Sequence, residues 1–347
     1  MTTNRTPTPG GAPARAGSEN TMMRAVIHTR YGPIAGDVLR CATVDRPTLH
    51  ADSVLVRVRA SSVDRGTWHI MAGLPYPIRL AGFGLRSPKH LNPGRCVAGM
   101  VTATGTDVTS FQVGDEVFGT CDGAFAEYVT AAPDKLALIP SGLSPAQAAS
   151  LPVSAVTALQ AVRDHGRVQV GEHVLVVGAS GGVGTFAVQI AKAFSAQVTG
   201  VCSSTKADLV YSLGADRVID HGSTDFAAGT TRYDVILDIG GNNSLSRLRR
   251  ALTPRGTLVI VGGETDGRLL GGFDRTLRAL LLSPFIKQNL RTFVTAENGS
   301  DLETLGQLFD AGRLRPVIDR TYQLSEVANA VEHVVGGLAR GKTVITI

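Results

Sequence analysis

The amino-acid sequence predicts an α/β protein in which a doubly wound parallel sheet is joined to a smaller β-rich domain. Three observations predict this fold class. An apolar run at 174–177 leads through a glycine-dense turn into a segment whose apolar residues have helical spacing. From residue 197 onward, strand-like and helix-like segments alternate. Before residue 130, short strand-like segments follow one another between Gly, Pro and Asp turns, as in compact β-barrel-like domains.

The glycine-dense turn at 178–184 lies between a predicted buried strand and a predicted helix, which is the context of a dinucleotide-binding fingerprint. Its spelling departs from G-x-G-x-x-G, because the three positions fall on Ala179, Gly181 and Gly184. Glycines let the backbone approach a pyrophosphate, and the helix N-terminus offers free N–H groups and positive partial charge. The candidate cofactor-binding residues of the turn are Ser180, Gly181, Gly182, Val183 and Gly184.

The elements before this turn are short. Residues 1–22 are rich in Thr, Pro, Gly and Ala, and they predict a disordered tail, with a transit peptide as the alternative. Ser144 before Pro145 predicts the N-cap of a helix, and a second helix at 154–162 leads to the turn. Residues 61–95 predict loops and a short helix. Strands are predicted at 24–28, 53–60, 96–104, 113–119 (after an initial turn) and 124–129.

After the turn the alternation predicts strands at 197–202, 217–219, 233–238 and 257–261, and helices at 205–213, 244–252, 272–282 and 301–312. In a doubly wound sheet the ligand crevice lies beyond the carboxyl ends of the strands. Three such ends carry glycines or small polar residues: 178–184, 203–204 and 262–263, so Gly262 joins the cofactor-binding candidates. The closing segment 342–347 alternates in polarity and predicts a strand that returns to the β-rich domain.

The composition indicates a folded protein with no nucleic-acid and no membrane partner. Basic residues exceed acidic ones by 34 to 29, and the resulting charge of +5 is spread along the chain rather than clustered. The four cysteines form no C-x-x-C pair, which favours a reducing, cytoplasmic location. The uncharged stretch 136–162 is interrupted by prolines and is no membrane span. The amphipathic segment 272–282 predicts a helix on the sheet or at a subunit contact, with a membrane-surface role as the alternative.

The order of a β-rich domain, a nucleotide-binding sheet and a C-terminal return resembles the medium-chain dehydrogenase/reductase superfamily. Local phrases are similar to its zinc-independent quinone oxidoreductase branch, namely 113–119, 151–160, 178–184, 213–216 and 339–342. The resemblance covers residues 23–347. It implies a GroES-like domain formed by 23–150 and 297–347, a Rossmann domain at 151–296, hydride chemistry in the cleft between them, and a homodimer.

The segment after the second predicted strand, 202–206, contains no acid. NAD-preferring sites place an acid there to bind the ribose 2′-hydroxyl, whereas hydroxyls and a lysine suit a 2′-phosphate. We therefore expect NADPH as the cofactor. The resemblance implies that Ser203, Ser204 and Lys206 line the 2′-phosphate, although Lys206 as a solvated residue of a helical turn is the alternative. It also implies a cofactor contact for His221, where the family often has tyrosine, for Thr157 and for Lys342.

The zinc-binding members of the superfamily supply a cysteine and a Gly-His-Glu segment at positions that here read 60–64 and 93–99 without them. The loop of four cysteines that binds a structural zinc is also missing. Cys96, Cys121 and His69 are interpreted as bystanders rather than ligands, so no metal is expected. Without a Lewis acid, the reduction of an electrophilic quinone or α,β-unsaturated carbonyl is favoured over dehydrogenation of an unactivated alcohol.

The family loop that often reads Asn-x-x-Asp, with Tyr two residues on, has Ser61, Asp64 and Gly66 here. The resemblance implies Asp64 and Ser61 as catalytic candidates, and a structural turn carboxylate is the alternative for Asp64. The predicted function is NADPH-dependent reduction of a quinone or enone. Two other hypotheses stay open: an alcohol dehydrogenase that works without zinc, and a non-catalytic NADPH-binding redox sensor or scaffold.

Overall fold

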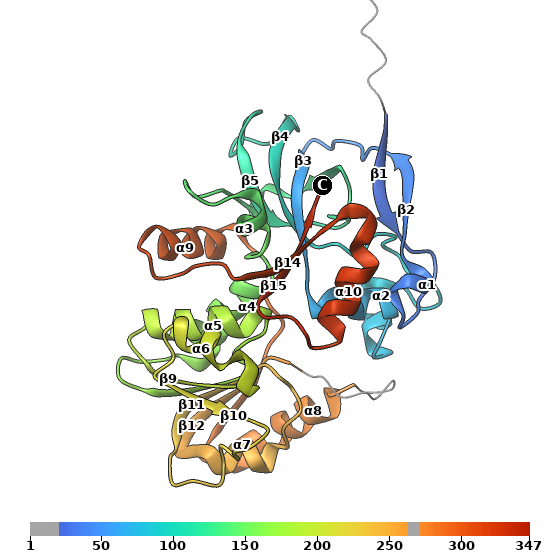
Figure 1. Cartoon of the computed structure of the whole chain (residues 1–347). Coiled ribbons are helices and arrows are strands. Elements are labelled where there is room, and N and C mark those ends of the chain that lie inside the picture. The colour runs from blue at the N-terminus through green and yellow to red at the C-terminus, as the bar shows by residue number, and fades with distance from the viewer. Residues whose placement is uncertain (1–20, 263–270) are drawn as a thin grey trace, which may run out of the picture.

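The computed structural model describes residues 21–262 and 271–347, so nearly all of the predicted tail at 1–22 lies outside the described residues. The molecule has two halves, each built on one large sheet. A parallel sheet occupies the lower half of Figure 1 and a mixed sheet the upper half, with helices α4 (Ser154–Gln160) and α5 (Gly182–Ala193) between them.

Within the described ranges the parallel sheet has the strand order β10-β9-β8-β11-β12-β13, and all its neighbours run parallel. The first strand in sequence, β8, therefore has later strands on both sides, and the predicted doubly wound sheet is confirmed. The crevice of such a sheet opens where the strand order reverses, beside the end of β8. The strands are β8 (His173–Val177), β9 (Gln197–Cys202), β10 (Arg217–Asp220), β11 (Tyr233–Asp238), β12 (Leu252–Ile260) and β13 (Asn289–Thr292).

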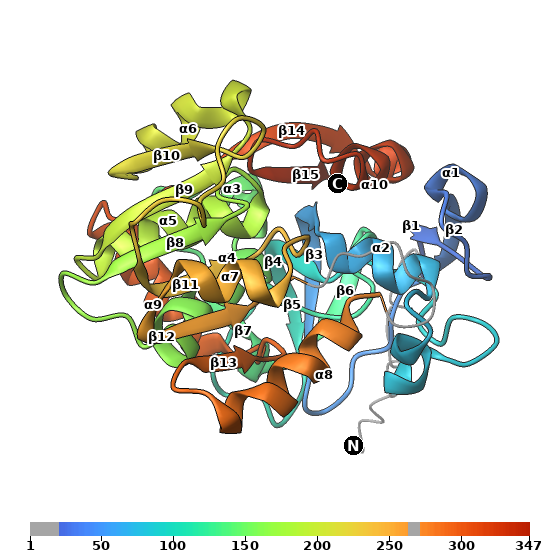
Figure 2. The same cartoon turned by 90° about the horizontal axis from the view of Figure 1, so that it is seen from below.

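Helices cover both faces of this sheet, which explains the unbroken apolar run of β8. Val174 and Val176 pack into the core that contains Phe186 of α5, whereas Leu175 packs into the opposite core with Leu248. That second core is covered by α7 (Leu245–Ala251) and α8 (Phe273–Leu282), which lie on the near side in Figure 2. The remaining helical turns of this half are η3 (Ala161–Gly166), η4 (Ser204–Lys206), α6 (Ala207–Ser212) and η5 (Ser283–Phe285).

In the described part of the chain the mixed sheet has the order β14-β15-β3-β4-β5-β7, with β6 paired to β3. Its last strand, β15 (Lys342–Thr346), lies antiparallel to β3 (Val54–Val63), so the predicted return of the chain to the β-rich domain is confirmed. The pair β1 (Met22–Ile27) and β2 (Arg40–Asp45) forms a separate ladder. The other strands are β4 (Cys96–Thr104), β5 (Glu116–Thr120), β6 (Tyr128–Ala131), β7 (Leu136–Leu138) and β14 (Ile318–Gln323).

The helices of this half are short. The predicted N-cap Ser144 accepts a hydrogen bond from the Gln147 backbone N–H at the start of α3 (Pro145–Ala149). Residues 61–95 contain more helix than expected, with α2 (Arg65–Ala72) and the π-helical turn η1 (Arg79–Phe83). The others are α1 (Ala35–Val38), η2 (Pro133–Lys135), α9 (Gly299–Asp310), η6 (Leu324–Glu326) and α10 (Val327–Val335).

One predicted boundary in the parallel sheet is wrong. The sequence predicts a turn at 253–256 before the strand, but β12 begins at Leu252, directly after α7. Leu252 pairs with Tyr233, and the register then shifts before Thr257 pairs with Val235. The irregularity accommodates Pro254, which has no N–H to donate to a regular ladder.

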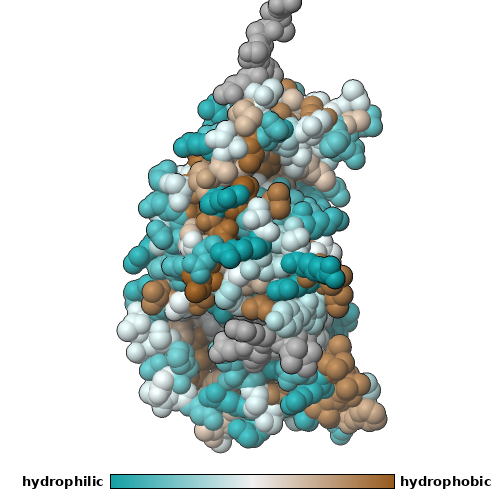
Figure 3. Space-filling model, turned by 90° about the vertical axis from the view of Figure 1, so that its right-hand side faces the viewer, coloured by the Kyte–Doolittle hydropathy of each residue, from teal (hydrophilic) through white to brown (hydrophobic). Residues whose placement is uncertain are grey.

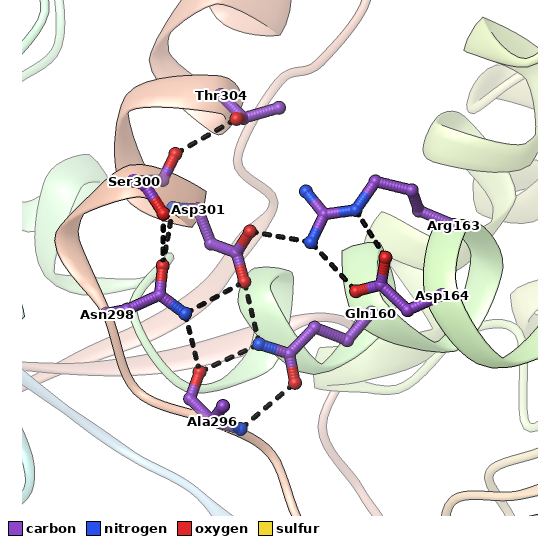
Figure 4. Close-up of polar contacts among 8 residues, drawn as sticks. All are labelled: Gln160, Arg163, Asp164, Ala296, Asn298, Ser300, Asp301 and Thr304. Carbon is purple, nitrogen blue, oxygen red and sulfur yellow. Dashed lines mark hydrogen bonds and ion pairs between the residues drawn. The ribbon is translucent and has the colours of Figure 1, made fainter.

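A polar network fixes the segment that leads from β13 to α9 (Figure 4). The Gln160 side chain donates to the Ala296 carbonyl at 2.7 Å and accepts from the Ala296 N–H at 3.0 Å. Gln160 also donates to the Asp301 carboxylate at 2.7 Å, and Arg163 binds the other oxygen of Asp301 at 2.8 Å. The predicted domain boundary at 296/297 falls inside this network, and it stays a prediction.

Candidate active site

A cavity of about 1050 Å³ lies between the parallel sheet and the segments contributed by the mixed sheet. The ends of β8, β9, β11 and β12 line one side of this cleft, where the doubly wound topology predicts a ligand crevice. The β3–α2 junction, α4 and the segment before β15 line the other side. The predicted site residues that line it are Asp64, Thr157, Ser180, Gly181, Gly182, Val183, Ser203, Lys206, His221, Gly262 and Lys342.

The glycine turn approaches the cleft as bare backbone. A Cβ atom on Gly184 would lie 2.0 Å from the Gly178 carbonyl oxygen, so this position requires glycine for the close packing of α5 on the turn. Gly184 therefore supports the turn without lining the cleft. Gly178 has a φ of +86°, a conformation that favours glycine. The first N–H groups of α5, which begins at Gly182, have no partners within the helix and are available to an anion.

The end of β9 provides hydroxyl groups and a lysine, as expected for a 2′-phosphate. Ser203, Thr205 and Lys206 line the cleft. The Lys206 ammonium donates to the carbonyls of Gly337 and Ala339, both at 2.9 Å. Lys206 is thus held by the loop before β15, and its contact with a 2′-phosphate stays a prediction beside the alternative of a solvated residue of a helical turn.

Ser204 does not line the cleft with its neighbours. Its side chain is exposed, and its backbone N–H donates to the Asp220 carboxylate at 3.2 Å. The expected contact of the Ser204 side chain with a 2′-phosphate is therefore not favoured by the geometry. Thr205, which the sequence analysis did not select, occupies the cleft wall instead, and Arg340 lines the cleft nearby, 2.8 Å from Asp208.

A charged network lies where the two halves of the molecule meet. The Lys342 ammonium, only 1% exposed, pairs with the Asp64 carboxylate and donates to the Ser154 hydroxyl at 2.9 Å. Ser154 in turn donates to Asp64 at 2.7 Å, and the Cys96 thiol lies 3.4 Å from the other Asp64 oxygen. A Cβ on Gly182 would lie 3.2 Å from Lys342 Cδ, so the aliphatic part of this side chain packs beside the glycine turn.

The second catalytic candidate, Ser61, does not line the cleft. Its hydroxyl is fully buried and donates to the Cys96 carbonyl at 2.6 Å, between strands β3 and β4. The structure therefore separates Ser61 from Asp64, although the two lie three positions apart in the sequence. The alternation of a strand directs the Ser61 side chain into the mixed sheet, whereas Asp64 follows the end of β3.

Thr157 lies in the cleft as expected, and its hydroxyl contacts that of Thr295 at 2.8 Å. Gly262 also lines the cleft; a Cβ there would lie 2.1 Å from the Ile239 carbonyl oxygen. Sequence reasoning did not find Ser154, Thr295, Asn242, Asn243 or Arg340. Ser154 and Arg340 belong to recognised local phrases, and Asn242 and Asn243 follow a strand end, so a signal existed for those four. Thr295 has no such signal in the sequence.

In the described ranges, no group of three or more His, Cys, Asp or Glu side chains is arranged to hold a metal ion. Burial raises the pKa of the Cys96 thiol to about 12 and also raises the pKa of Cys121, whereas metal ligation requires a thiolate. The His69 Nδ1 lies 2.8 Å from the Leu74 carbonyl. These properties give Cys96, Cys121 and His69 structural environments, and the absence of a metal requirement stays a prediction. Among the described helices, none has the length and apolarity to cross a bilayer.

Comparisons with known proteins agree with this architecture. A family model described as "Alcohol dehydrogenase GroES-like domain" matches residues 50–141, and one described as "Zinc-binding dehydrogenase" matches residues 213–345. "NAD(P)H oxidoreductase RTN4IP1, mitochondrial" from Mus musculus is 34% identical, over 95% of this chain and 90% of its own length. "2-methylene-furan-3-one reductase" from Solanum lycopersicum is 30% identical, over 93% of this chain and 79% of its own length.

A solved structure of the quinone oxidoreductase from Coxiella burnetii superimposes with a TM-score of 0.79 and 28% identity, covering 94% of this chain and 99% of that one. The mouse relative is named as mitochondrial, so the predicted cytoplasmic location of this chain stays a prediction. The solved structure thus shares the fold of this chain over nearly its whole length. The chain therefore belongs to the medium-chain dehydrogenase/reductase superfamily and is a quinone oxidoreductase-like oxidoreductase.

Proposed function

We propose that this protein uses NADPH to reduce a quinone or the C=C bond of an α,β-unsaturated carbonyl, without a metal. The observation that carries the proposal is the composition of the cleft. A glycine turn and a helix N-terminus face hydroxyls and a lysine at the end of β9, where no acid opposes a 2′-phosphate. The relatives named as quinone and furanone reductases support the acceptor class.

The residues present fit a phosphorylated dinucleotide. Gly184 lets α5 pack closely on the turn, and the N-terminus of α5 would hold the diphosphate. Lys206 has three N–H donors, and two of them bind carbonyls in the described part of the structure. The third would bind the 2′-phosphate, and His221 would cover the adenine ribose. When bound, NADPH supplies the hydride that the acceptor receives.

Asp64 acts, in this proposal, by holding Lys342. Both of its oxygens are occupied: one by Lys342 and Ser154, and the other by the Cys96 thiol. The ion pair fixes the Lys342 side chain, whose Cδ would lie 3.2 Å from a Cβ on Gly182, against the turn where the diphosphate would lie. Desolvation at such a site strengthens the attraction between opposite charges. Asp64 thereby supports cofactor binding, and its participation in proton transfer stays a prediction.

The acceptor would lie at the wall formed by Thr157 and Thr295. Transfer of a hydride must be accompanied by a proton, which solvent can supply, because the Thr157 hydroxyl donates to the Val153 carbonyl at 2.7 Å. Quinones and enones are already electrophilic, so their reduction does not depend on polarisation by a metal ion.

The test is oxidation of NADPH by the purified protein in the presence of 1,2-naphthoquinone and of a panel of enones, with metal analysis of the same sample. Turnover with an acceptor in a preparation without stoichiometric zinc supports the proposal. Tight NADPH binding with no turnover in either panel would instead identify a non-catalytic NADPH-binding protein. Stoichiometric zinc together with alcohol oxidation would replace the proposal with a zinc-dependent dehydrogenase.

A homodimer also stays a proposal. Apolar side chains gather at the lower right of the face shown in Figure 3, at the end of the molecule formed by the parallel sheet and its helices. The exposed apolar residues of that end include Leu277, Leu280, Leu281 and Phe285. Such a cluster is larger than scattered surface residues and is typical of an interface.

A further inference from the structure

Arg275 is a buried arginine that does not line the cleft and has no part in the proposed reaction so far. It lies in the first turn of α8, and only 7% of its surface is exposed. The same helix exposes Arg278, whose side chain is 76% exposed. Burying a guanidinium costs free energy unless its N–H donors are hydrogen-bonded. The contacts of Arg275 therefore indicate the role of this buried side chain.

The guanidinium of Arg275 joins the ends of two neighbouring strands. It donates to the Asp238 carboxylate at 2.5 Å, to the Gly262 carbonyl at 2.5 Å and to the Asn243 carbonyl at 3.0 Å. Asp238 is the last residue of β11 and is fully buried. Gly262 follows β12, and Asn243 belongs to the loop after β11. One planar fork therefore fixes the ends of two neighbouring strands to each other and to α8.

Both loops that Arg275 holds form a wall of the cleft. Gly240, Asn242 and Asn243 line it after β11, and Gly262 lines it after β12. The backbone carbonyl of Asp238 also accepts from the N–H groups of Val261 and Gly262, both at 3.1 Å. These backbone bonds join the strand ends, and Ile239 and Gly240 also donate to the Val177 carbonyl at 3.0 and 3.1 Å. Arg275 adds a side-chain link that reaches further along both loops, to the Asn243 and Gly262 carbonyls.

The strand order determines which part of a dinucleotide these loops would meet. β9, with Ser203 and Lys206 at its end, lies on one side of β8, and β11 and β12 lie on the other. A dinucleotide crosses the sheet at the point where the order reverses. The adenine half would therefore lie over β9, and the nicotinamide half over the loops that Arg275 holds.

We propose that Arg275 is a positioning residue for the nicotinamide half of the cofactor, acting through the loops after β11 and β12. The inference rests on the proposed NADPH function. It differs from that proposal because it concerns a residue outside the cleft and one half of the ligand. Loss of the Arg275 contacts should weaken binding of the whole dinucleotide and leave its adenine fragment bound as before.

Two variants test the proposal in proteins that we expect to stay folded. Arg275→Lys retains a positive charge beside Asp238 but cannot span the Gly262 and Asn243 carbonyls with a planar fork. The double variant Asp238→Asn with Arg275→Met removes both charges, which avoids an unpaired charge in the core. Arg278→Lys is the matched control, because it makes the same change one turn later on the same helix at an exposed position.

The experiment measures dissociation constants by calorimetry for NADPH and for adenosine 2′,5′-bisphosphate, the fragment that carries the adenine half. For both Arg275 variants we expect NADPH binding to weaken about tenfold, as for loss of a hydrogen bond to a charged group, with fragment affinity unchanged. Arg278→Lys should change neither value. Equal weakening of both ligands would show general distortion and overturn the proposal, as would unchanged NADPH affinity.

Failure of the proposed function has a separate signature. If the wild-type protein bound NADH but neither NADPH nor the bisphosphate, the 2′-phosphate assignment would be wrong. The same comparison with NADH and 5′-AMP would then test Arg275 independently, since both loops lie on the nicotinamide side for either cofactor.

Discussion

Lys206 belongs to the parallel-sheet half of the molecule, yet two carbonyls of the loop before β15 hold its ammonium group. The sequence shows the lysine and the missing acid, and from these the cofactor preference could be predicted. It does not show the carbonyls, because Gly337 and Ala339 lie more than 130 residues further along the chain. A lysine held in this way loses less rotamer entropy on meeting a phosphate than a mobile one does.

We predict that Lys206→Glu lowers the affinity for NADPH by about tenfold to a hundredfold and removes the preference over NADH. The substitution removes a charge-assisted hydrogen bond worth about 1.5–3 kcal/mol and places a negative charge beside the 2′-phosphate. Titration of both cofactors by fluorescence measures the effect. Lys287→Glu makes the same charge change at an exposed position outside the cleft and should leave both affinities unchanged. A Lys206→Glu variant that kept its preference would contradict the assignment.

The strand β8 and the helix α5 are elements that the sequence pattern predicted well. The apolar run predicted a strand buried on both faces, and its residues do alternate between two cores. The end of α7 and the start of β12 could not be predicted, because Pro254 and Gly256 read locally as a turn while the ladder with β11 continues past them. Tertiary pairing decided that boundary. The Gln160–Asp301 network was equally hidden, since its members come from α4 and α9.

That network predicts a pH-dependent contribution to stability. Burial of the Asp301 carboxyl raises its pKa, but hydrogen bonds from Gln160, Arg163 and Asn298 outweigh burial, so the pKa lies below its ordinary value. A lowered folded-state pKa contributes stability above the unfolded pKa of about 3.9 and loses it as the pH falls through the folded value. We therefore expect Asp301→Asn to lower the free energy of unfolding most at neutral pH.

The measurement is urea unfolding of the wild-type protein and Asp301→Asn from pH 7 down to the acid limit of the folded state. The difference between the two proteins should be constant above about pH 4 and shrink as the pH falls further. Asp310→Asn, at the end of the same helix, changes the same functional group outside the network and is the control. A difference that did not vary with pH would contradict the assigned charge of Asp301.

At the scale of the whole molecule, the pattern of sequence motifs predicted both sheets and the cleft between them. Most predicted cofactor residues line that cleft, because they follow strand ends that topology brings to one edge. Ser61 and Ser204 were selected because they match positions of a family motif, but neither lines the cleft. The Ser61 hydroxyl donates to the Cys96 carbonyl, and the Ser204 backbone N–H donates to Asp220. A motif thus identifies a segment more reliably than it identifies a side chain.

The packing of the whole molecule also predicts which thiols react. Cys41 is exposed, whereas Cys96, Cys121 and Cys202 are buried, and burial raises the pKa of all three. A reagent that reacts with thiolates at pH 8 should therefore label one cysteine per chain in the native state and four in denaturant. Mass spectrometry counts the labels. Cys41→Ser should reduce native labelling to nearly zero, and rapid labelling of Cys96 in the native protein would show that the mixed sheet opens.

The contact between Lys342 and Asp64 joins residues 278 positions apart in the sequence. Closing so long a loop costs chain entropy, which the packing of the folded chain offsets. The ion pair needs β15 beside β3, and Lys342 also needs Ser154 of α4, so the pair belongs to a chain in which both halves have folded. A dinucleotide that binds this assembled state stabilises it by mass action, and the stabilisation grows with the logarithm of its concentration over its dissociation constant. A dinucleotide bound in the cleft would thus favour chains whose last strand has docked over chains in which it has not.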